Sequence, residues 1–163
     1  MTKVDNDVNI VPSLLDRLLD DDPEVSKEPV TSRIQDLRAY EGAVARDLEA
    51  LLNSRHETLE ELPSEFVEVN RSLVTYGLPD LTSLSLLSQD DRNRIRRAVE
   101  QAITVFEPRL LRVRVALEAP RERDRGLHFR IDALLRVDPT PEPVTFDAVL
   151  QLNTQQYVIQ RNS

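Results

Sequence analysis

Residues 103–117 read Ile-Thr-Val-Phe-Glu-Pro-Arg-Leu-Leu-Arg-Val-Arg-Val-Ala-Leu, and the spacing of apolar side chains changes within them. Before Pro108 the apolar residues recur at the 3.6-residue period of a helix. After it they alternate with charged residues at the two-residue period of a half-buried strand. Proline also biases the residue before it, Glu107, toward extended geometry. This stretch therefore predicts a helix that ends at the proline and is followed by a β-sheet.

Three alternating stretches follow Pro108. Their apolar positions are Leu111, Val113, Val115 and Leu117, then Leu127, Phe129, Ile131, Ala133, Leu135 and Val137, then Val144, Phe146, Ala148, Leu150 and Leu152. The connections Pro120–Gly126 and Asp138–Pro143 are short and turn-rich, which predicts an antiparallel meander. A last extended piece, Gln156–Gln160, is expected to form a fourth strand at the edge. Such an edge either accepts a strand from another chain or is closed by the domain's own tail, and the residues leave both readings open.

Two long helices are expected before the sheet. The first runs from near Thr31 to Asn53, where Ser32 and Gln35 form a capping-box pattern. The second follows Ser88, a suitable N-cap residue. The elements together predict an α+β fold, with N-terminal helices packed on one face of a small antiparallel sheet of three to four strands.

A short amphipathic piece, Pro12–Leu19, precedes this domain, and its leucines fall on one helical face. A piece flanked by charge and proline cannot form a core alone, so we expect it to dock on its own domain or on a partner. The predicted organisation is an N-terminal extension over residues 1–30 and a single domain over residues 31–163.

Composition narrows the class of protein. The chain has 163 residues, 40 % of them hydrophobic and none of them cysteine, which suits one domain without disulfides or thiolate metal sites. A net charge of −8 argues against a dedicated nucleic-acid binder. The charge is uneven, since residues 1–70 hold 7 Lys/Arg and 17 Asp/Glu whereas residues 71–163 hold 14 and 12. No signal peptide is visible, and with no run of about 18 apolar residues we expect no membrane insertion.

Two sets of charges invite a functional interpretation. If residues 107–109 are extended, Glu107 and Arg109 point to the same side, with their Cα atoms about 6.6 Å apart. They can pair with each other, pair with a partner's charges, or stay solvated beside a helix-ending proline. The second set clusters in the first half of the second helix, where the helix dipole disfavours cations: Arg92, Arg94, Arg96 and Arg97. These arginines face solvent, the chain's own acidic first helix, or an acidic partner.

Four segments occur in an order and at spacings that resemble a known family. They are Leu14-Leu15-Asp16-Arg17-Leu18, Arg46-Asp47-Leu48-Glu49-Ala50-Leu51-Leu52-Asn53-Ser54-Arg55, Tyr76-Gly77-Leu78-Pro79-Asp80-Leu81 and Glu107-Pro108-Arg109-Leu110. The set resembles the TssE-type baseplate subunits of type VI secretion systems, within the lysozyme-related family of contractile-phage baseplate wedge proteins. The resemblance covers nearly the whole chain.

The resemblance implies a small cytoplasmic α+β assembly protein. Its implied partners are the wedge subunits TssF and TssG and the tail-sheath proteins, whose first ring the chain would template. By position, Glu107, Pro108 and Arg109 match the family's signature motif, and Tyr76, Gly77, Pro79 and Asp80 match a second common segment. These seven residues are the predicted partner-binding residues.

The family name raises the question of glycoside hydrolysis, which usually needs two carboxyl groups, about 5–5.5 Å apart for retention or about 6.5–9.5 Å for inversion. Glu107 is the candidate acid, but its neighbour Arg109 favours the ionised form, which is the wrong state for an acid. His56 and His128 lack metal-ligand spacing. We therefore expect no enzyme, no catalytic residue, no metal, no cofactor and no small-molecule substrate. The alternatives are a peptidoglycan-cleaving lysozyme-like enzyme and a soluble adaptor with the same fold.

Overall fold

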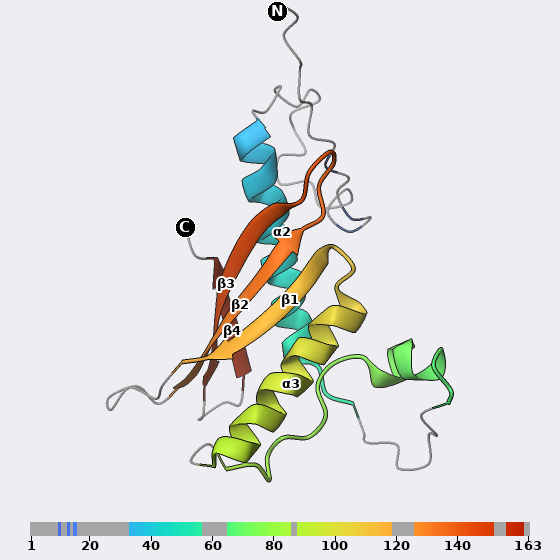
Figure 1. The fold of residues 1–163 in the computed structure, drawn as a ribbon, viewed down its shortest axis with the longest axis vertical. Helices are drawn as coiled ribbons and strands as arrows, with labels where there is room; N and C mark the ends of the chain where they lie inside the picture. Colours follow the sequence, from blue (N-terminus) through green and yellow to red (C-terminus); the bar gives the residue numbers. More distant parts are fainter. Residues whose placement is uncertain are drawn as a thin grey trace, which may run out of the picture.

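The computed structural model of the chain describes residues 10, 13, 15, 33–56, 65–85, 88–118, 126–151 and 156–161. Its elements are α2 (Arg33–Asn53), the 3-10 turns η1 (Val69–Arg71) and η2 (Leu73–Thr75), α3 (Gln89–Phe106), β1 (Leu110–Leu117), β2 (Gly126–Leu135), β3 (Glu142–Gln151) and β4 (Gln156–Arg161). The strands form one antiparallel sheet in the order β1-β2-β3-β4 (Figure 1). The predicted α+β fold with a four-stranded meander is confirmed.

The described residues include the predicted start of α3 but not the predicted start of α2. The Ser88 hydroxyl accepts from the amide of Asp91 and caps α3, as expected. Ser32 and most of the Pro12–Leu19 piece lie outside the described residues, and the boundary near residue 30 stays a prediction. Residues 69–71 and 73–75 form the two 3-10 turns. No helix in the described part of the chain is both long and apolar enough to cross a membrane.

The core lies between the helices and one face of the sheet. Helix α2 packs mainly on β4, helix α3 mainly on β1, and α2 runs behind the strands in Figure 1. The most deeply buried side chains of the core are Val44, Leu48, Leu52, Leu78, Ile95, Val99, Ile103, Phe129, Ile131, Leu135, Phe146 and Tyr157. The opposite face of the sheet is polar, where Arg130 lies 3.5 Å from Glu118 and 3.7 Å from Asp147. One buried and one charged face explain the two-residue alternation.

One part of that alternation is corrected by the structure. Leu110 is the buried residue at the start of β1, and the predicted Leu111 is only half-buried. The cause is a β-bulge between Leu111 and Arg114, in which Arg112 adopts a φ of 53°. An extra residue in one strand moves the side chains before it to the other face. Strict alternation therefore holds only after the bulge.

Side chains from the helices cover the middle of both sheet edges. Asn53 at the end of α2 bonds the amide and the carbonyl of Tyr157 in β4, over 2.8 and 2.9 Å. Glu49, one turn earlier, accepts from the amide of Ile159 over 3.0 Å. On the other edge, Glu100 of α3 accepts from the amide of Val115 over 3.0 Å. The β4 edge is thus occupied by the chain's own first helix at these positions.

Gly77 is required by a close approach between two segments. Its φ is 104°, and a Cβ there would lie 2.5 Å from the Ser54 carbonyl oxygen. We expect Gly77→Ala to lower the free energy of unfolding by about 2–4 kcal/mol, because a strained φ and a backbone clash add. Gly42→Ala is the matched control in α2, where a Cβ meets nothing within 4 Å. It should stabilise by about 0.5–1 kcal/mol. Urea unfolding measures both, and a neutral Gly77→Ala would contradict the packing.

The hydroxyl of Tyr157 offers a second stability test. Tyr157 is 1 % exposed, and its buried hydroxyl has no hydrogen-bond partner among the described residues. Burial raises the pKa of Tyr157 to about 12. Because an unsatisfied buried hydroxyl costs free energy, Tyr157→Phe should be neutral or stabilise by up to about 1 kcal/mol. A thermal melt checks this, and a clear drop in Tm would reveal a partner for the hydroxyl.

Candidate functional site

The signature segment forms a tight turn instead of the extended piece that the sequence suggested. Helix α3 ends at Phe106, and Glu107 adopts φ −117° and ψ 81°. The amide of Leu110 donates to the Glu107 carbonyl over 3.1 Å and closes a four-residue turn. Glu107 and Arg109 still lie on the same side, as predicted, because their side chains bond each other.

Glu107 and Arg109 form a forked ion pair. Arg109 Nε donates to Glu107 Oε1 over 2.7 Å, and Nη2 donates to Oε2 over 2.5 Å. The backbone amide of Arg109 also donates to Oε1 over 3.2 Å. Glu107 is 5 % exposed and the Arg109 side chain 17 %. A two-pronged, charge-assisted contact that is largely removed from water fixes the relative position of both side chains.

Asp47 extends this pair to α2. Arg109 Nη2 donates to Asp47 Oδ2 over 2.7 Å, across 62 positions of sequence. The second carboxylate oxygen of Asp47 accepts from Arg46 over 3.0 Å. The guanidinium carbon of Arg109 lies 5.9 Å from the ring centroid of Tyr40, a cation–π distance. We call the three side chains of Glu107, Arg109 and Asp47 the brace.

The brace holds a permanent cation at its centre. The hydrogen bond to Glu107 and then the contact with Asp47 raise the pKa of Arg109, although its desolvation opposes them. Arg109 therefore stays charged at every pH at which the fold is studied. Its backbone carbonyl accepts from the amide of Arg136 over 2.7 Å. The brace thus joins α2, the end of α3, and the residue that follows β2.

The second predicted segment lies partly beside the brace. The Tyr76 ring packs edge-to-face on Phe106, with centroids 5.3 Å apart. Burial, and then the charges of Asp47 and Glu107, raise the pKa of Tyr76. Leu78 is fully buried. Its amide donates to the Ser54 carbonyl over 3.0 Å, and its carbonyl accepts from the His56 amide over 3.1 Å. Tyr76–Leu78 is therefore clamped between the end of α2 and the end of α3.

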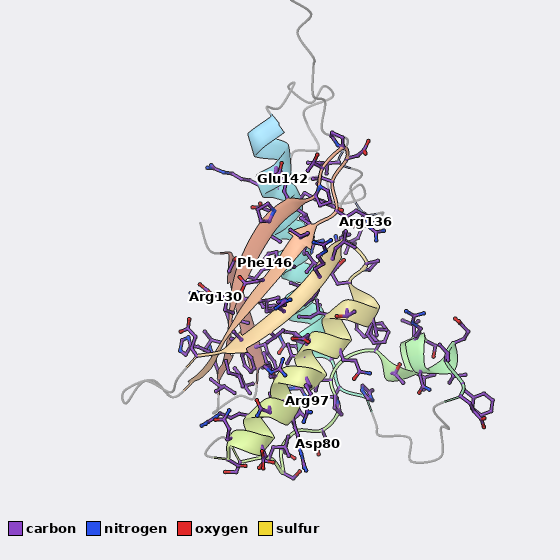
Figure 2. The ribbon with its side chains drawn as sticks, in the orientation of Figure 1. Asp80, Arg97, Arg130, Arg136, Glu142 and Phe146 are labelled. Atoms are coloured by element: carbon purple, nitrogen blue, oxygen red, sulfur yellow. The ribbon has the colours of Figure 1, made fainter. Side chains whose placement is uncertain are left out.

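Asp80, in the same predicted segment, lies apart from the brace. Its carboxylate accepts from the amide of Thr82 over 2.9 Å, and this bond lowers the pKa of Asp80. Figure 2 draws it beside the first half of α3, whereas the junction with β1 is at the other end of that helix. Asp80 and Pro108 are both exposed. Of the seven predicted residues, only Asp80 and Pro108 are thus exposed, and they lie near opposite ends of α3.

A cleft of about 510 Å³ lies between α3 and the segment before it. Its lining includes Gly77 and Pro79 on one wall and Ala98, Ala102 and Val105 on the other. No carboxylate lines it within the described part of the chain, and His56 is its titratable side chain. The described residues also hold no group of three potential metal ligands from His, Cys, Asp and Glu.

The arginine cluster divides into side chains bonded within α3 and exposed side chains. Arg96 lies 3.1 Å from Glu100, the residue that also holds the β1 edge, and Arg92 bonds Gln89. Arg94 and Arg97 are exposed, and Arg97 is labelled on α3 in Figure 2. The partner of Arg96 thus lies on α3 itself and not on the acidic first helix.

Sequence reasoning missed two residues of this site, Tyr40 and Asp47. They are seven positions apart on α2, so helical spacing alone places them on one face. That spacing was the available signal. It could not show that Arg109 is the residue they meet, because the contact spans the whole helical half of the domain.

The fold and the site together define a small α+β domain whose helical half and sheet are joined by a buried ion-pair brace. The family model of the baseplate wedge protein gp25 matches residues 38–140. The chain belongs to this baseplate wedge family. No curated protein sequence matches the chain.

The brace makes a direct prediction for stability. Arg109→Ala leaves Glu107 buried without its cation, so we expect a loss of about 3–5 kcal/mol in the free energy of unfolding. Arg109→Lys should not restore it, because an ammonium cannot reproduce the fork. Arg94→Ala, an exposed arginine of α3, is the control and should change stability by less than about 0.5 kcal/mol. Circular dichroism melting compares them, and equal Tm values for Arg109→Ala and the control would refute the brace.

Proposed function

We propose that the chain is the TssE-type wedge subunit of a type VI secretion baseplate. In this role it joins TssF and TssG in the wedge and templates the first ring of the contractile sheath. Membership of the baseplate wedge family carries the proposal. The four ordered segments, whose resemblance is to the type VI subunits, support the narrower assignment.

The geometry supports a role in assembly. The Glu107–Arg109 pair fixes the turn that carries the exposed Pro108, and Asp80 is exposed near the other end of α3. We propose that these two exposed residues contact the wedge partners. The brace then acts indirectly at Pro108, by holding that turn rigid so that little conformational entropy is lost on binding.

We propose further that the chain is not an enzyme and acts in the cytoplasm without a cofactor. Both carboxylate oxygens of Glu107 accept hydrogen bonds from Arg109, so neither is available to a glycosidic oxygen. The cleft beside α3 has no carboxylate among its described lining residues. The alternatives are a peptidoglycan-cleaving enzyme and a soluble adaptor.

Co-purification tests the assembly role. Tagged chain expressed with TssF, TssG and sheath proteins should recover all of them. Asp80→Asn removes an exposed charge but keeps the acceptor for Thr82, so it should weaken recovery without changing the Tm. Asp90→Asn, an exposed aspartate of α3, is the matched control. Recovery of a single unrelated protein instead of the wedge subunits would favour the adaptor.

A zymogram on purified peptidoglycan tests the catalytic alternative. We expect no clearing from the wild-type chain at any loading. Clearing that disappears in Glu107→Gln would overturn the structural assignment. Because Glu107→Gln also disturbs the brace, its Tm must be measured beside its activity.

A further inference from the structure

Exposed apolar side chains are concentrated in one short segment. The large hydrophobic residues that stand exposed in the described part of the chain are Leu15, Phe66, Val67, Val69, Leu73 and Val74. Five of these six fall within residues 66–74, and Leu73 is 84 % exposed. We call residues 66–74 the apolar knob. Single exposed apolar residues are common on protein surfaces, but a contiguous group is typical of an interaction site.

The apolar knob is ordered by local hydrogen bonds and not by burial. Neither η1 nor η2 contains a buried residue. The Ser72 hydroxyl donates to the Val69 carbonyl over 2.7 Å, and the Thr75 hydroxyl donates to the Asn70 carbonyl over 2.9 Å. Backbone bonds from Ser72 to Val69 and from Thr75 to Ser72 close the two turns. The backbone polar groups are thus satisfied while the apolar side chains face water.

The end of the apolar knob is fastened to the body of the domain. Tyr76 packs on Phe106 and Gly77 fits against Ser54, so the segment leaves the core at a defined point. Figure 1 shows η1 and η2 standing out beyond α3, away from the sheet. A fastened, projecting and hydrogen-bonded segment presents its apolar side chains in one arrangement, which lowers the entropic cost of docking.

Charge around the apolar knob indicates the kind of surface it fits. Glu65 beside it and Glu68 within it are both exposed, and Arg71 is the exposed basic residue of the same segment. An apolar centre with exposed glutamates at its N-terminal end complements an apolar socket with basic residues on its rim, the usual arrangement of a desolvated centre and polar rim.

We propose that the apolar knob is a protein-docking element that inserts Leu73 and Val74 into an apolar socket rimmed by lysine or arginine on a partner protein. Its residues are distinct from the proposed contact residues Pro108 and Asp80. Glutamates repel an anionic membrane, so lipid is not its occupant. They also repel each other across a symmetric contact of two identical knobs.

The test rests on the proposed function, because it uses the TssF–TssG complex as the probe. Binding of the full-length chain to that complex is measured at low and at high salt. Leu73→Ser with Val74→Ser should raise the Kd at least about tenfold while the Tm is unchanged, because both side chains are exposed. Leu73→Met with Val74→Ile is the matched control, which keeps the apolar character and should keep the affinity.

A second variant tests the basic rim. Glu65→Lys with Glu68→Lys should weaken binding and remove most of its salt dependence. Unchanged affinity and unchanged salt dependence would overturn the charge complementarity.

The outcomes separate this inference from the proposed function. Failure of the wild-type chain to bind TssF–TssG would refute the proposed function. Equal binding by the wild type and the serine variant would refute the apolar knob alone. Binding of the wild type to phosphatidylglycerol vesicles would overturn the protein socket in favour of a lipid surface. A wild-type dimer in light scattering that is lost in the serine variant would overturn it in favour of a second copy of the chain.

Discussion

The ion pair between Glu107 and Arg109, extended to Asp47, is the contact on which the arrangement of this domain depends. It sits where the helical half of the chain meets the sheet, and it joins α2 to the turn between α3 and β1. A buried charge without its partner is costly, so each member is held by the others. The turn and the start of β1 take their positions from this cluster.

The same use of helix side chains recurs at the sheet. The side chains of Glu49 and Asn53 accept hydrogen bonds from backbone amides of β4, and Glu100 accepts one from an amide of β1. An open four-stranded sheet exposes two rows of backbone donors and acceptors, which invite uncontrolled pairing. The helices cover the middle of both rows. A partner that adds a strand at either position must first displace a helix side chain.

These features suit a subunit that serves as a rigid piece of a larger assembly. This description agrees with the chain's membership of the baseplate wedge family. The domain has a braced interior and a polar outer sheet face, and the apolar knob projects to one side (Figure 1). The knob and the turn at Pro108 are formed by different residues, so the two proposed contacts do not share side chains.

Local sequence signals predict the α+β class, the meander, the start of α3 after Ser88 and its end beside Pro108. These features depend on spacing, capping and proline geometry, which neighbouring residues settle. The burial of Leu110 in place of Leu111 became visible only in the folded sheet, because a bulge resets the alternation. The tertiary structure also decided that Arg109 meets Asp47 and Tyr40, since residues 62 and 69 positions away come together only when the helices pack on the sheet. Local sequence therefore cannot show whether a charged side chain pairs inside the domain or faces a partner, because the packing decides which residues meet.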